Sequence, residues 1–210
     1  MTIEEYCRQH SSLPSSAQTL EWIKHQTHLR TNHARMLSGP IEGGLLGAIS
    51  RLMRPRRVLE LGVFTGYSTV CLAEGLADDG RIDAIEINDE LEDIIREGYQ
   101  IAGISGKVCL HLGDALEIIP TLEDVYDLVY IDANKRHYPD YWRLVADKVR
   151  TGGAIIADNT LWDGKVVQEP APRDVQSAGI LEFNNLVASD RRFRTLMLPM
   201  RDGVTIAIRN

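Results

Sequence analysis

Short apolar runs alternate with longer amphipathic segments along most of this chain. The apolar runs predict strands, because they are brief and rich in Val, Ile and Leu. They are Arg57–Leu61, Arg81–Ile87, Lys107–Leu112, Asp127–Asp132, Ala154–Asp158, Arg194–Leu198 and Thr205–Arg209. The segments between them predict helices at Tyr67–Gly75, Glu90–Ala102, Tyr138–Val149 and Val175–Ser189, with a short turn at Ala115–Ile119. This alternation predicts an α/β fold with a doubly wound, mainly parallel sheet.

The two ends of the chain depart from this alternation. Residues 1–53 form an N-terminal segment that is predicted to be helical from Ala17 to Met53, with a break near Ser38–Pro40. The last two strands are joined only by Pro199–Val204, which is too short for a crossover helix, so we expect an antiparallel pair at one edge. We predict one domain of 210 residues, in which this helical segment precedes a core at 54–210.

Charge and composition favour a small-molecule substrate. The chain has 23 Lys plus Arg against 30 Asp plus Glu, a net charge of -7 and no dense basic run, which argues against nucleic-acid binding. It has no signal-like segment, no lipidation motif and no apolar run long enough for a membrane span. We therefore expect a cytoplasmic protein that does not bind a membrane.

The three cysteines show neither disulfide nor zinc-site spacing. Cys7, Cys71 and Cys109 are odd in number and far apart in the sequence. We expect them to be reduced, with Cys71 and Cys109 packed in the core. His25, His28 and His33 form an N-terminal cluster without Cys or acidic partners at ligand spacing, so solvent-facing helix positions are favoured over a metal site.

A strand–turn–helix unit at Val58–Ser68 indicates a nucleoside cofactor. Gly62 and Gly66 let the backbone turn tightly and approach a ligand closely. A dinucleotide site would have Gly-x-Gly-x-x-Gly, whereas this chain has Glu60-x-Gly-x-x-x-Gly. The Glu60 carboxylate would repel a pyrophosphate, but it suits the charged amino-acid end of S-adenosylmethionine. The turn therefore favours methyl transfer over nicotinamide chemistry.

Acidic residues stand at the carboxyl ends of five predicted strands, where open α/β sheets bind their ligands. They are Glu60, Glu86, Asp114, Asp132 and Asp158. Glu86 follows Glu60 at the spacing of an acid that binds ribose hydroxyls. Asp114 can accept a hydrogen bond from an adenine amino group, with the small Ala115 leaving room for the ring. Taken singly, each acid could instead cap a helix or lie in a solvated loop.

Asp132, Asp158 and Asn159 indicate a metal site. Three oxygen ligands from adjacent strand ends match a hard divalent cation such as Mg²⁺, Mn²⁺ or Ca²⁺, with positions left for water or a chelating substrate. The alternative is that Asp158 and Asn159 only cap a turn.

Six segments between Ala34 and Arg209 form a specific pattern. They are Ala34–Pro40 (ARMLSGP), Glu60–Ser68 (ELGVFTGYS), Gly113–Ala115 (GDA), Ile131–Lys135 (IDANK), Asp158–Trp162 (DNTLW) and Asp202–Gly203 (DG). With these segments the chain resembles the cation-dependent O-methyltransferases related to catechol and caffeoyl-coenzyme A O-methyltransferases. The resemblance implies a Rossmann-like methyltransferase sheet and, commonly, a homodimer with the N-terminal helices near the active site.

The resemblance also implies a role for individual residues. It implies S-adenosylmethionine contacts at Met36, Glu60, Gly62, Ser68, Glu86, Asp114, Ala115 and Asp132. It implies a metal bound by Asp132, Asp158 and Asn159, and Lys135 as the catalytic base, although a lysine stem lying over Tyr138 is the alternative for Lys135. The chain departs from the family pattern at Asn134, where many relatives have an acid, and at Gly44, where Gln is frequent.

The expected reaction is metal-dependent methyl transfer from S-adenosylmethionine to a hydroxyl of a small catechol-like aromatic substrate. Mg²⁺ would chelate two adjacent substrate oxygens and lower the pKa of one hydroxyl. Tyr138 and Trp162 could line the acceptor pocket or could simply pack. The alternatives are a nicotinamide-dependent oxidoreductase, a methyltransferase with a non-catechol acceptor and a non-catalytic nucleoside-binding module; cofactor binding and transfer assays separate them.

Overall fold

Seven strands form one sheet in the computed structural model, which describes residues 1–12, 14–169 and 171–210. The strand order is β3-β2-β1-β4-β5-β7-β6. The strands are β1 Arg57–Leu61, β2 Arg81–Glu86, β3 Val108–Leu112, β4 Tyr126–Ile131, β5 Val149–Asp158, β6 Phe193–Leu198 and β7 Val204–Arg209. Strands β1 to β5 pair in parallel, and β7 is antiparallel to both of its neighbours, β5 and β6. The prediction of a mainly parallel sheet with an antiparallel C-terminal pair is confirmed.

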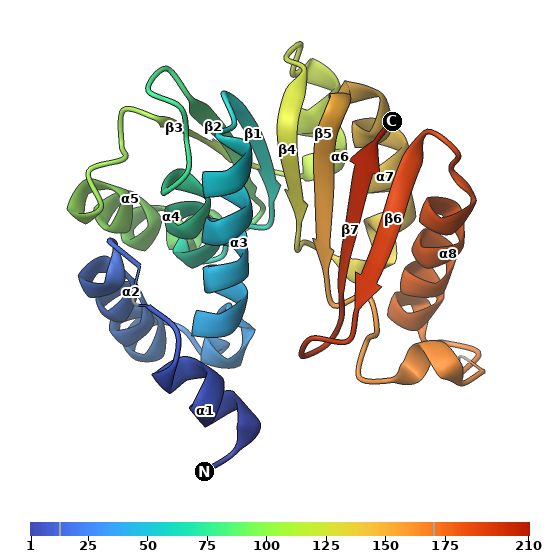
Figure 1. The fold of residues 1–210 in the computed structure, drawn as a ribbon, viewed down its shortest axis with the longest axis horizontal. Coiled ribbons are helices and arrows are strands. Elements are labelled where there is room, and N and C mark those ends of the chain that lie inside the picture. Colours follow the sequence, from blue (N-terminus) through green and yellow to red (C-terminus); the bar gives the residue numbers. More distant parts are fainter. Residues whose placement is uncertain (13, 170) are drawn as a thin grey trace.

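Helices cover both faces of the sheet (Figure 1). The α-helices are α1 Ile3–Gln9, α2 Ala17–Arg30, α3 Pro40–Met53, α4 Tyr67–Ala73, α5 Glu92–Ile101, α6 Ala115–Ile118, α7 Tyr138–Val145 and α8 Val175–Ser189. Short 3₁₀ turns are η1 Ala34–Met36, η2 Asp89–Leu91, η3 Ile119–Thr121, η4 Lys135–His137, η5 Ala146–Lys148 and η6 Lys165–Val167. Within the described residues, no helix is both long and apolar enough to cross a membrane.

The central strand β4 explains why both faces carry a core. Leu128 and Tyr130 belong to the cluster beneath α2 to α5, while Val129 and Ile131 belong to the cluster beneath α7 and α8. Successive side chains of a strand point to opposite faces, so a strand buried on both sides must be apolar throughout. This is why the sequence shows continuous apolar runs rather than alternation in the central strands.

Several predicted boundaries shift by a few residues, and the two largest differences are in the N-terminal segment and at the start of β5. The break between the N-terminal helices is longer than expected, because α2 ends at Arg30 and α3 begins only at Pro40, whose fixed φ suits a first helical position. A further helix, α1, precedes them. Strand β5 begins at Val149 rather than Ala154, across a register irregularity that its glycines accommodate.

The expectation that Cys109 packs in the core is wrong. Cys71 is buried, but Cys109 is exposed, as is Cys7. Cys109 lies on β3, one of the two edge strands, and the helix that follows, α6, is only four residues long. All three cysteines are free thiols, as expected. His25, His28 and His33 are exposed, in agreement with the solvent-facing interpretation.

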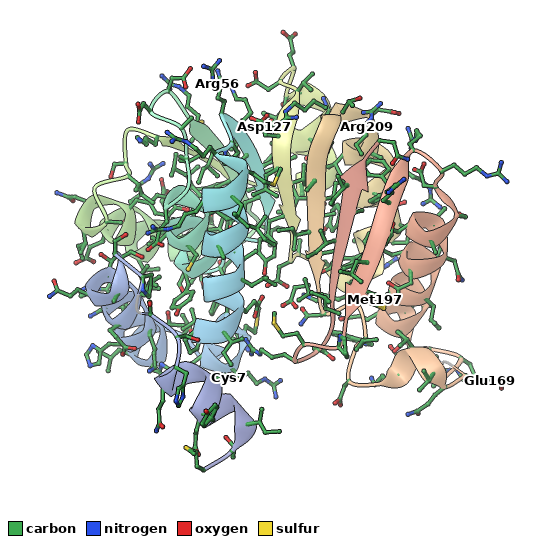
Figure 2. The ribbon with its side chains drawn as sticks, viewed as in Figure 1. Cys7, Arg56, Asp127, Glu169, Met197 and Arg209 are labelled. Carbon is green, nitrogen blue, oxygen red and sulfur yellow. The ribbon has the colours of Figure 1, made fainter. Side chains whose placement is uncertain are left out.

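Asp127 ties three strands together at the amino end of the sheet (Figure 2). Its Oδ2 accepts hydrogen bonds from the backbone N–H groups of Arg56 at 2.7 Å and Arg57 at 2.8 Å. Its Oδ1 pairs with the guanidinium of Arg150 at the start of β5. Burial alone would raise the pKa of Asp127, but these donors hold it below its ordinary value. The amino ends are thus fixed by charge, while the carboxyl ends remain available for ligands.

Helix α3 lies unusually close to the end of α4 because the contact is made through glycine. A Cβ at Gly75 would overlap the backbone of Ser50 and Arg51. Gly43, one turn into α3, likewise faces Cys71 and Tyr67 with no room for a side chain. This close packing fixes α3 over the sheet, and the first turn of α3 consequently reaches the carboxyl ends of the strands.

We predict that Gly75→Ala destabilises the fold by about 3 kcal/mol, because the added methyl overlaps backbone that cannot rotate away. Gly44→Ala is the matched control, since Gly44 lies on the exposed side of α3 with open space around it. It should stabilise the protein by roughly 0.5–1 kcal/mol through helix propensity. Urea unfolding of both variants tests this, and equal midpoints would contradict it.

Candidate functional site

The turn between β1 and α4 brings two strand ends into contact. Gly62 has φ +91°, and a Cβ there would overlap the carbonyl of Asp132 at the end of β4. Gly66, with φ +89°, starts α4. Only glycine combines this left-handed conformation with such a close backbone approach. The turn also reaches β2, because the N–H of Phe64 donates to Glu86 Oε2 at 2.6 Å.

Glu60 is completely buried beside this turn and has one oxygen without a partner. Ser68 Oγ donates to Glu60 Oε1 at 2.5 Å, whereas Oε2 has no hydrogen-bond partner among the described residues. Burial raises the pKa of Glu60 to about 7, against the lowering effect of hydrogen bonds from Ser68 and Thr69. A buried unpaired acceptor is costly unless a ligand supplies a donor. The ammonium group of S-adenosylmethionine has the required donor and charge.

Glu86 and Asp114 are both anchored by backbone donors. Glu86 is buried and also accepts from the N–H of Asn88 at 2.9 Å; burial raises its pKa. Asp114 Oδ1 accepts from the N–H of Leu116 at 2.9 Å and so caps α6, next to the buried Ala115. A carboxylate has about four acceptor positions, so these anchors leave capacity for a ribose or adenine donor. For Asp114, helix capping and ligand binding are therefore compatible.

Three carboxylates meet where α3 crosses the ends of β4 and β5. One oxygen each from Glu42, Asp132 and Asp158 lies within 4.8 Å of the others. Burial raises the pKa of Asp132 to about 6 and, with repulsion from Glu42, raises that of Asp158. Acids gathered in this way repel one another unless protons or a cation intervene. An all-oxygen donor set of this charge fits a hard divalent cation.

Glu42 is the member of this cluster that sequence reasoning missed. It is 3% exposed, and Tyr130 Oη donates to its Oε1 at 2.8 Å while Arg201 Nη1 donates to its Oε2 at 2.7 Å. One sequence feature could have indicated it: Glu42 is the only charged residue on a helix face whose other members are small or apolar. These members are Gly43, Leu46, Gly47 and Ser50, the other buried residues of α3. A buried charge at such a position requires partners.

Asn159 and Lys135 adjoin the cluster. Asn159 follows Asp158 directly and is partly buried, with a left-handed φ of +59° that asparagine tolerates better than most residues. Lys135 Nζ donates to Asp132 Oδ1 at 2.6 Å and lies 5.6 Å from the ring centroid of Tyr138. The same Nζ atom therefore contacts the acids and lies near the Tyr138 ring, so its position is compatible with either interpretation of Lys135.

The predicted aromatic walls have different environments. Tyr138 is completely buried, and its hydroxyl donates to the carbonyls of Asp158 at 3.0 Å and Ile131 at 3.3 Å, which supports the packing alternative. Trp162 is partly buried, and its backbone has a left-handed conformation. Its Nε1 has no hydrogen-bond partner among the described residues. It lies beside a pocket of about 550 Å³ lined by residues that include Leu161, Val166 and Arg201.

Met36 lies apart from these groups. It belongs to the η1 turn and is 57% exposed, so more than half of its surface faces solvent.

Hydrogen bonds and close contacts link the Gly62 turn with Glu60, Ser68 and Glu86. The acid cluster joins them through the contact of Gly62 with Asp132. Apart from Met36, the structure thus brings the residues expected to bind cofactor and metal to the carboxyl ends of the parallel strands.

Comparison with known proteins identifies the family. The sequence model of the O-methyltransferase family matches residues 8–210. The chain belongs to the O-methyltransferase family. This O-methyltransferase is 36% identical to caffeoyl-CoA O-methyltransferase 5 of Nicotiana tabacum over 213 residues, covering 93% of the chain and 85% of the relative. It is also 36% identical to caffeoyl-CoA O-methyltransferase 1 of Eucalyptus globulus, covering 83% of the chain and 75% of the relative.

Solved structures place this O-methyltransferase among S-adenosylmethionine-dependent enzymes. The O-methyltransferase TomG of Streptomyces achromogenes, solved in complex with SAM, has a TM-score of 0.91 and 27% identity, with both chains covered completely. The O-methyltransferase of Bacillus cereus, solved with SAH, has a TM-score of 0.86 and 28% identity over 92% of this chain and 91% of its own. The predictions of family and of S-adenosylmethionine-dependent O-methyl transfer are confirmed, and the oxidoreductase alternative is set aside.

Glu60→Gln should make stability less dependent on pH. The wild-type carboxyl, with an ordinary pKa of 4.5 and a folded value of about 7, favours the folded state below its ordinary pKa and loses that contribution as pH rises through about 7. We predict that the free energy of unfolding of Glu60→Gln rises relative to that of the wild type by on the order of 3 kcal/mol between about pH 4 and pH 8.

Urea unfolding of the ligand-free protein at both pH values measures this shift. Glu117→Gln is the matched control, because Glu117 is an exposed carboxylate on α6. A Glu60→Gln difference that stays constant with pH would show that Glu60 does not titrate in this range.

Proposed function

We propose that this O-methyltransferase transfers a methyl group from S-adenosylmethionine to one hydroxyl of a small catechol-like aromatic substrate, with the help of a divalent cation. The observation that carries the proposal is the cluster of buried Glu42 and Asp158 with partly buried Asp132, directly beside the Gly62 turn. The names of the caffeoyl-CoA O-methyltransferase relatives support an aromatic acceptor.

The cofactor is assigned to the turn and the first three strand ends. Glu60 Oε2 would take the ammonium group, with Ser68 holding the other carboxylate oxygen. Glu86 would bind the ribose, and Asp114 with Ala115 the adenine, since each carboxylate retains acceptor capacity. The closeness of Gly62 to Asp132 supports the interpretation that cofactor and metal share this edge. Met36 remains a proposed contact.

The metal is assigned to Asp132, Asp158 and Asn159, as predicted from their oxygen donors. When bound, the cation supplies a Lewis acid and a template for two adjacent substrate oxygens. Both oxygens of Glu42 already accept from Tyr130 and Arg201, so Glu42 is better placed to add negative potential and to hold Arg201 than to ligate directly. Mg²⁺ and Mn²⁺ both suit this donor set.

Lys135 is assigned as the base. Its Nζ lies 2.6 Å from Asp132 Oδ1 and comes from the η4 turn that directly follows β4, so it can reach a hydroxyl held at the acids. In its neutral form the Lys135 amine would accept the proton of the substrate hydroxyl. S-adenosylmethionine, when bound, would supply the electrophilic methyl group. Tyr138 fixes the ends of β4 and β5 through their carbonyls and so orients Asp158 without entering the pocket.

The substrate is assigned to the pocket between the 161–167 segment and the β6–β7 turn. Trp162 lies between the lining residues Leu161 and Asp163, and Lys165 Nζ lies 5.9 Å from its indole centroid. The predicted substrate-shaping segment Trp162–Gln176 begins here, although Pro170 within it lies outside the described residues.

A homodimer formed through the N-terminal helices, and a cytoplasmic location, also remain proposals. A groove of about 1090 Å³ between α1, α2 and α3 supports the homodimer. Its apolar lining includes Leu37, Ile41, Leu45 and Ala48.

We predict that labelled-methyl transfer from S-adenosylmethionine to a panel of catechols stops with EDTA and returns with Mg²⁺. Asp158→Ala should lower transfer by at least about 100-fold at limiting metal, because one of the metal's proposed carboxylate ligands is lost, while S-adenosylmethionine binding by calorimetry stays near wild type. Asp78→Ala is the matched control, as Asp78 is an exposed carboxylate between α4 and β2 and lies outside the cluster. Transfer that is unaffected by chelator or by Asp158→Ala would overturn the metal assignment, and cofactor binding without transfer to any catechol would overturn the acceptor class.

Lys135→Met should lower kcat by roughly 10²–10⁴-fold, the range for loss of a positioned base, with little change in KM for the cofactor. The assay needs saturating Mg²⁺ above pH 8, because losing Lys135 also removes the charge that holds down the pKa of Asp132 and so weakens metal binding at lower pH. Lys24→Met, at an exposed position on α2, is the control. A wild-type kcat under these conditions would exclude Lys135 as the base.

A further inference from the structure

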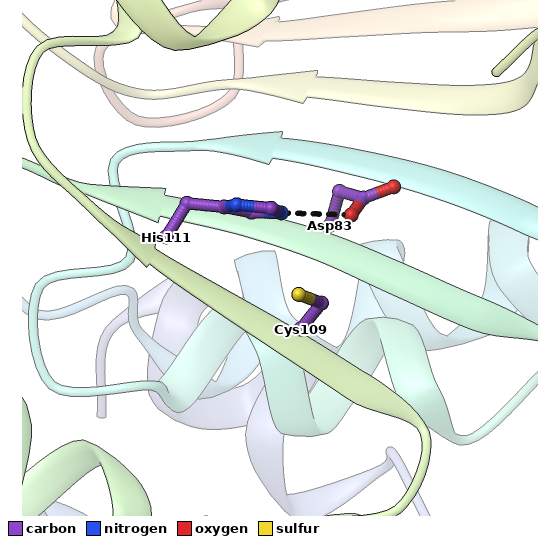
Figure 3. Close-up of side chains that lie close together, drawn as sticks. All are labelled: Asp83, Cys109 and His111. Atoms are coloured by element: carbon purple, nitrogen blue, oxygen red, sulfur yellow. Dashed lines mark hydrogen bonds and ion pairs between the residues drawn. The ribbon is translucent and has the colours of Figure 1, made fainter. Parts of the chain in front are cut away.

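A second group of potential metal ligands lies on the sheet itself, away from the acid cluster (Figure 3). Asp83 comes from β2, and Cys109 and His111 come from the edge strand β3. One ligand atom of each residue lies within 4.8 Å of the others. Neither the cofactor assignment nor the proposed mechanism uses these side chains.

The sheet register holds the three residues together. Asp83 pairs directly with Cys109, and His111 stands two residues further along the same strand, so all three side chains share one face. His111 Nε2 and Asp83 Oδ1 are 2.8 Å apart. Because all three sit on paired strands rather than on loops, only side-chain rotations are needed to bring the donors onto one ion.

The donor chemistry differs from that of the acid cluster. A thiolate sulfur, an imidazole nitrogen and a carboxylate oxygen suit a borderline cation such as zinc, whereas the acid cluster offers oxygen alone. Zinc bonds to these donors at about 2.0–2.3 Å, which requires donor atoms roughly 3–4 Å apart. The Nε2–Oδ1 separation of 2.8 Å must lengthen slightly to reach that value, while any longer separation, none of which exceeds 4.8 Å, must shorten.

Tyr126 supplies the support that ligating carboxylates usually have. Its hydroxyl donates to Asp83 Oδ2 at 3.1 Å, and its ring is completely buried. Asp83 Oδ1 is therefore the oxygen that remains directed towards His111. Outer hydrogen bonds of this kind fix the orientation of a ligand before the metal arrives.

The site is open to solvent on one side. Cys109 is exposed, and the side chains of His111 and Asp83 are 24% and 15% exposed. The cover on this face is short, because α6 spans only Ala115–Ile118. An ion can therefore reach the three donors, and a water molecule can complete a tetrahedral set.

We propose that Asp83, Cys109 and His111 form a second metal site for a zinc-like divalent cation. Binding replaces the Nε2···Oδ1 hydrogen bond by two bonds to the same ion, with the imidazole in its Nδ1–H tautomer. The thiol proton passes to solvent as the Sγ–metal bond forms. The proposal does not rest on the proposed function, because it involves another strand face and another donor set.

The test is titration of the full chain with Co²⁺, which reports a thiolate ligand through a near-ultraviolet charge-transfer band. We expect this band in the wild type and in Cys7→Ser, where another exposed cysteine is removed, and its loss in Cys109→Ser. Oxygen ligands in the acid cluster cannot produce this band, so an Asp158→Ala background should retain it. A missing band in the wild type, or one that persists in Cys109→Ser, overturns the site.

Zinc affinity provides an independent measurement. Competition with a chromophoric chelator should show that His111→Ala weakens the binding of one zinc ion per chain by at least about 100-fold. Tyr126→Phe should weaken it by roughly 10-fold, since the ring is kept and only the support of Asp83 is lost. Catechol methylation with Mg²⁺ should be unchanged in Cys109→Ser. Unchanged zinc affinity in His111→Ala contradicts the proposal.

Discussion

Buried carboxylates gathered at one edge of the sheet are the feature on which much of the remaining structure depends. Glu60, Asp132 and Asp158 all have raised pKa values because burial disfavours their charged forms. Such an arrangement costs stability that other parts of the fold must offset. The two apolar cores on either face of β4 and the Asp127 clamp at the opposite ends of the strands do so without adding charge to this edge. The acids can therefore remain close together for a cation and a cofactor.

Long-range contacts complete the site around these acids. Glu42 comes from α3, far earlier in the chain than its partners Tyr130 and Arg201. Its position follows from the glycine contacts that draw α3 onto α4, because a helix held farther from the sheet could not insert a carboxylate between β4 and β5. Arg201 in turn lies on the β6–β7 turn, which borders the pocket beside Trp162. The N-terminal helices and the C-terminal hairpin are thus joined through one buried acid.

The sequence predicted those features that have a local cause. The apolar runs were recognisable because strands such as β4 are buried on both faces. The turn after Glu60 was recognisable because its backbone conformation requires Gly62 and Gly66. Glu42 was missed because its burial depends on how α3 packs against the rest of the fold, and the local sequence does not indicate that packing. Cys109 was misplaced because an apolar run does not reveal which strand forms the edge. Likewise, the cluster of Asp83 with Cys109 and His111 depends on strand order and register, so sequence spacing could not indicate it.

Strand alternation also separates the two metal chemistries. On β2, Asp83 and Ile85 point to the face that carries α6 to α8, whereas Ala84 and Glu86 point to the face that carries α4. The Glu86 carboxylate therefore belongs to the cofactor side, and Asp83 belongs to the opposite side of the same strand. A cation at Asp83 and Cys109 cannot displace the cofactor by direct contact. Any influence on the cofactor site must pass through the ends of β2 and β3, where His111 is followed closely by Asp114 and the α6 cap.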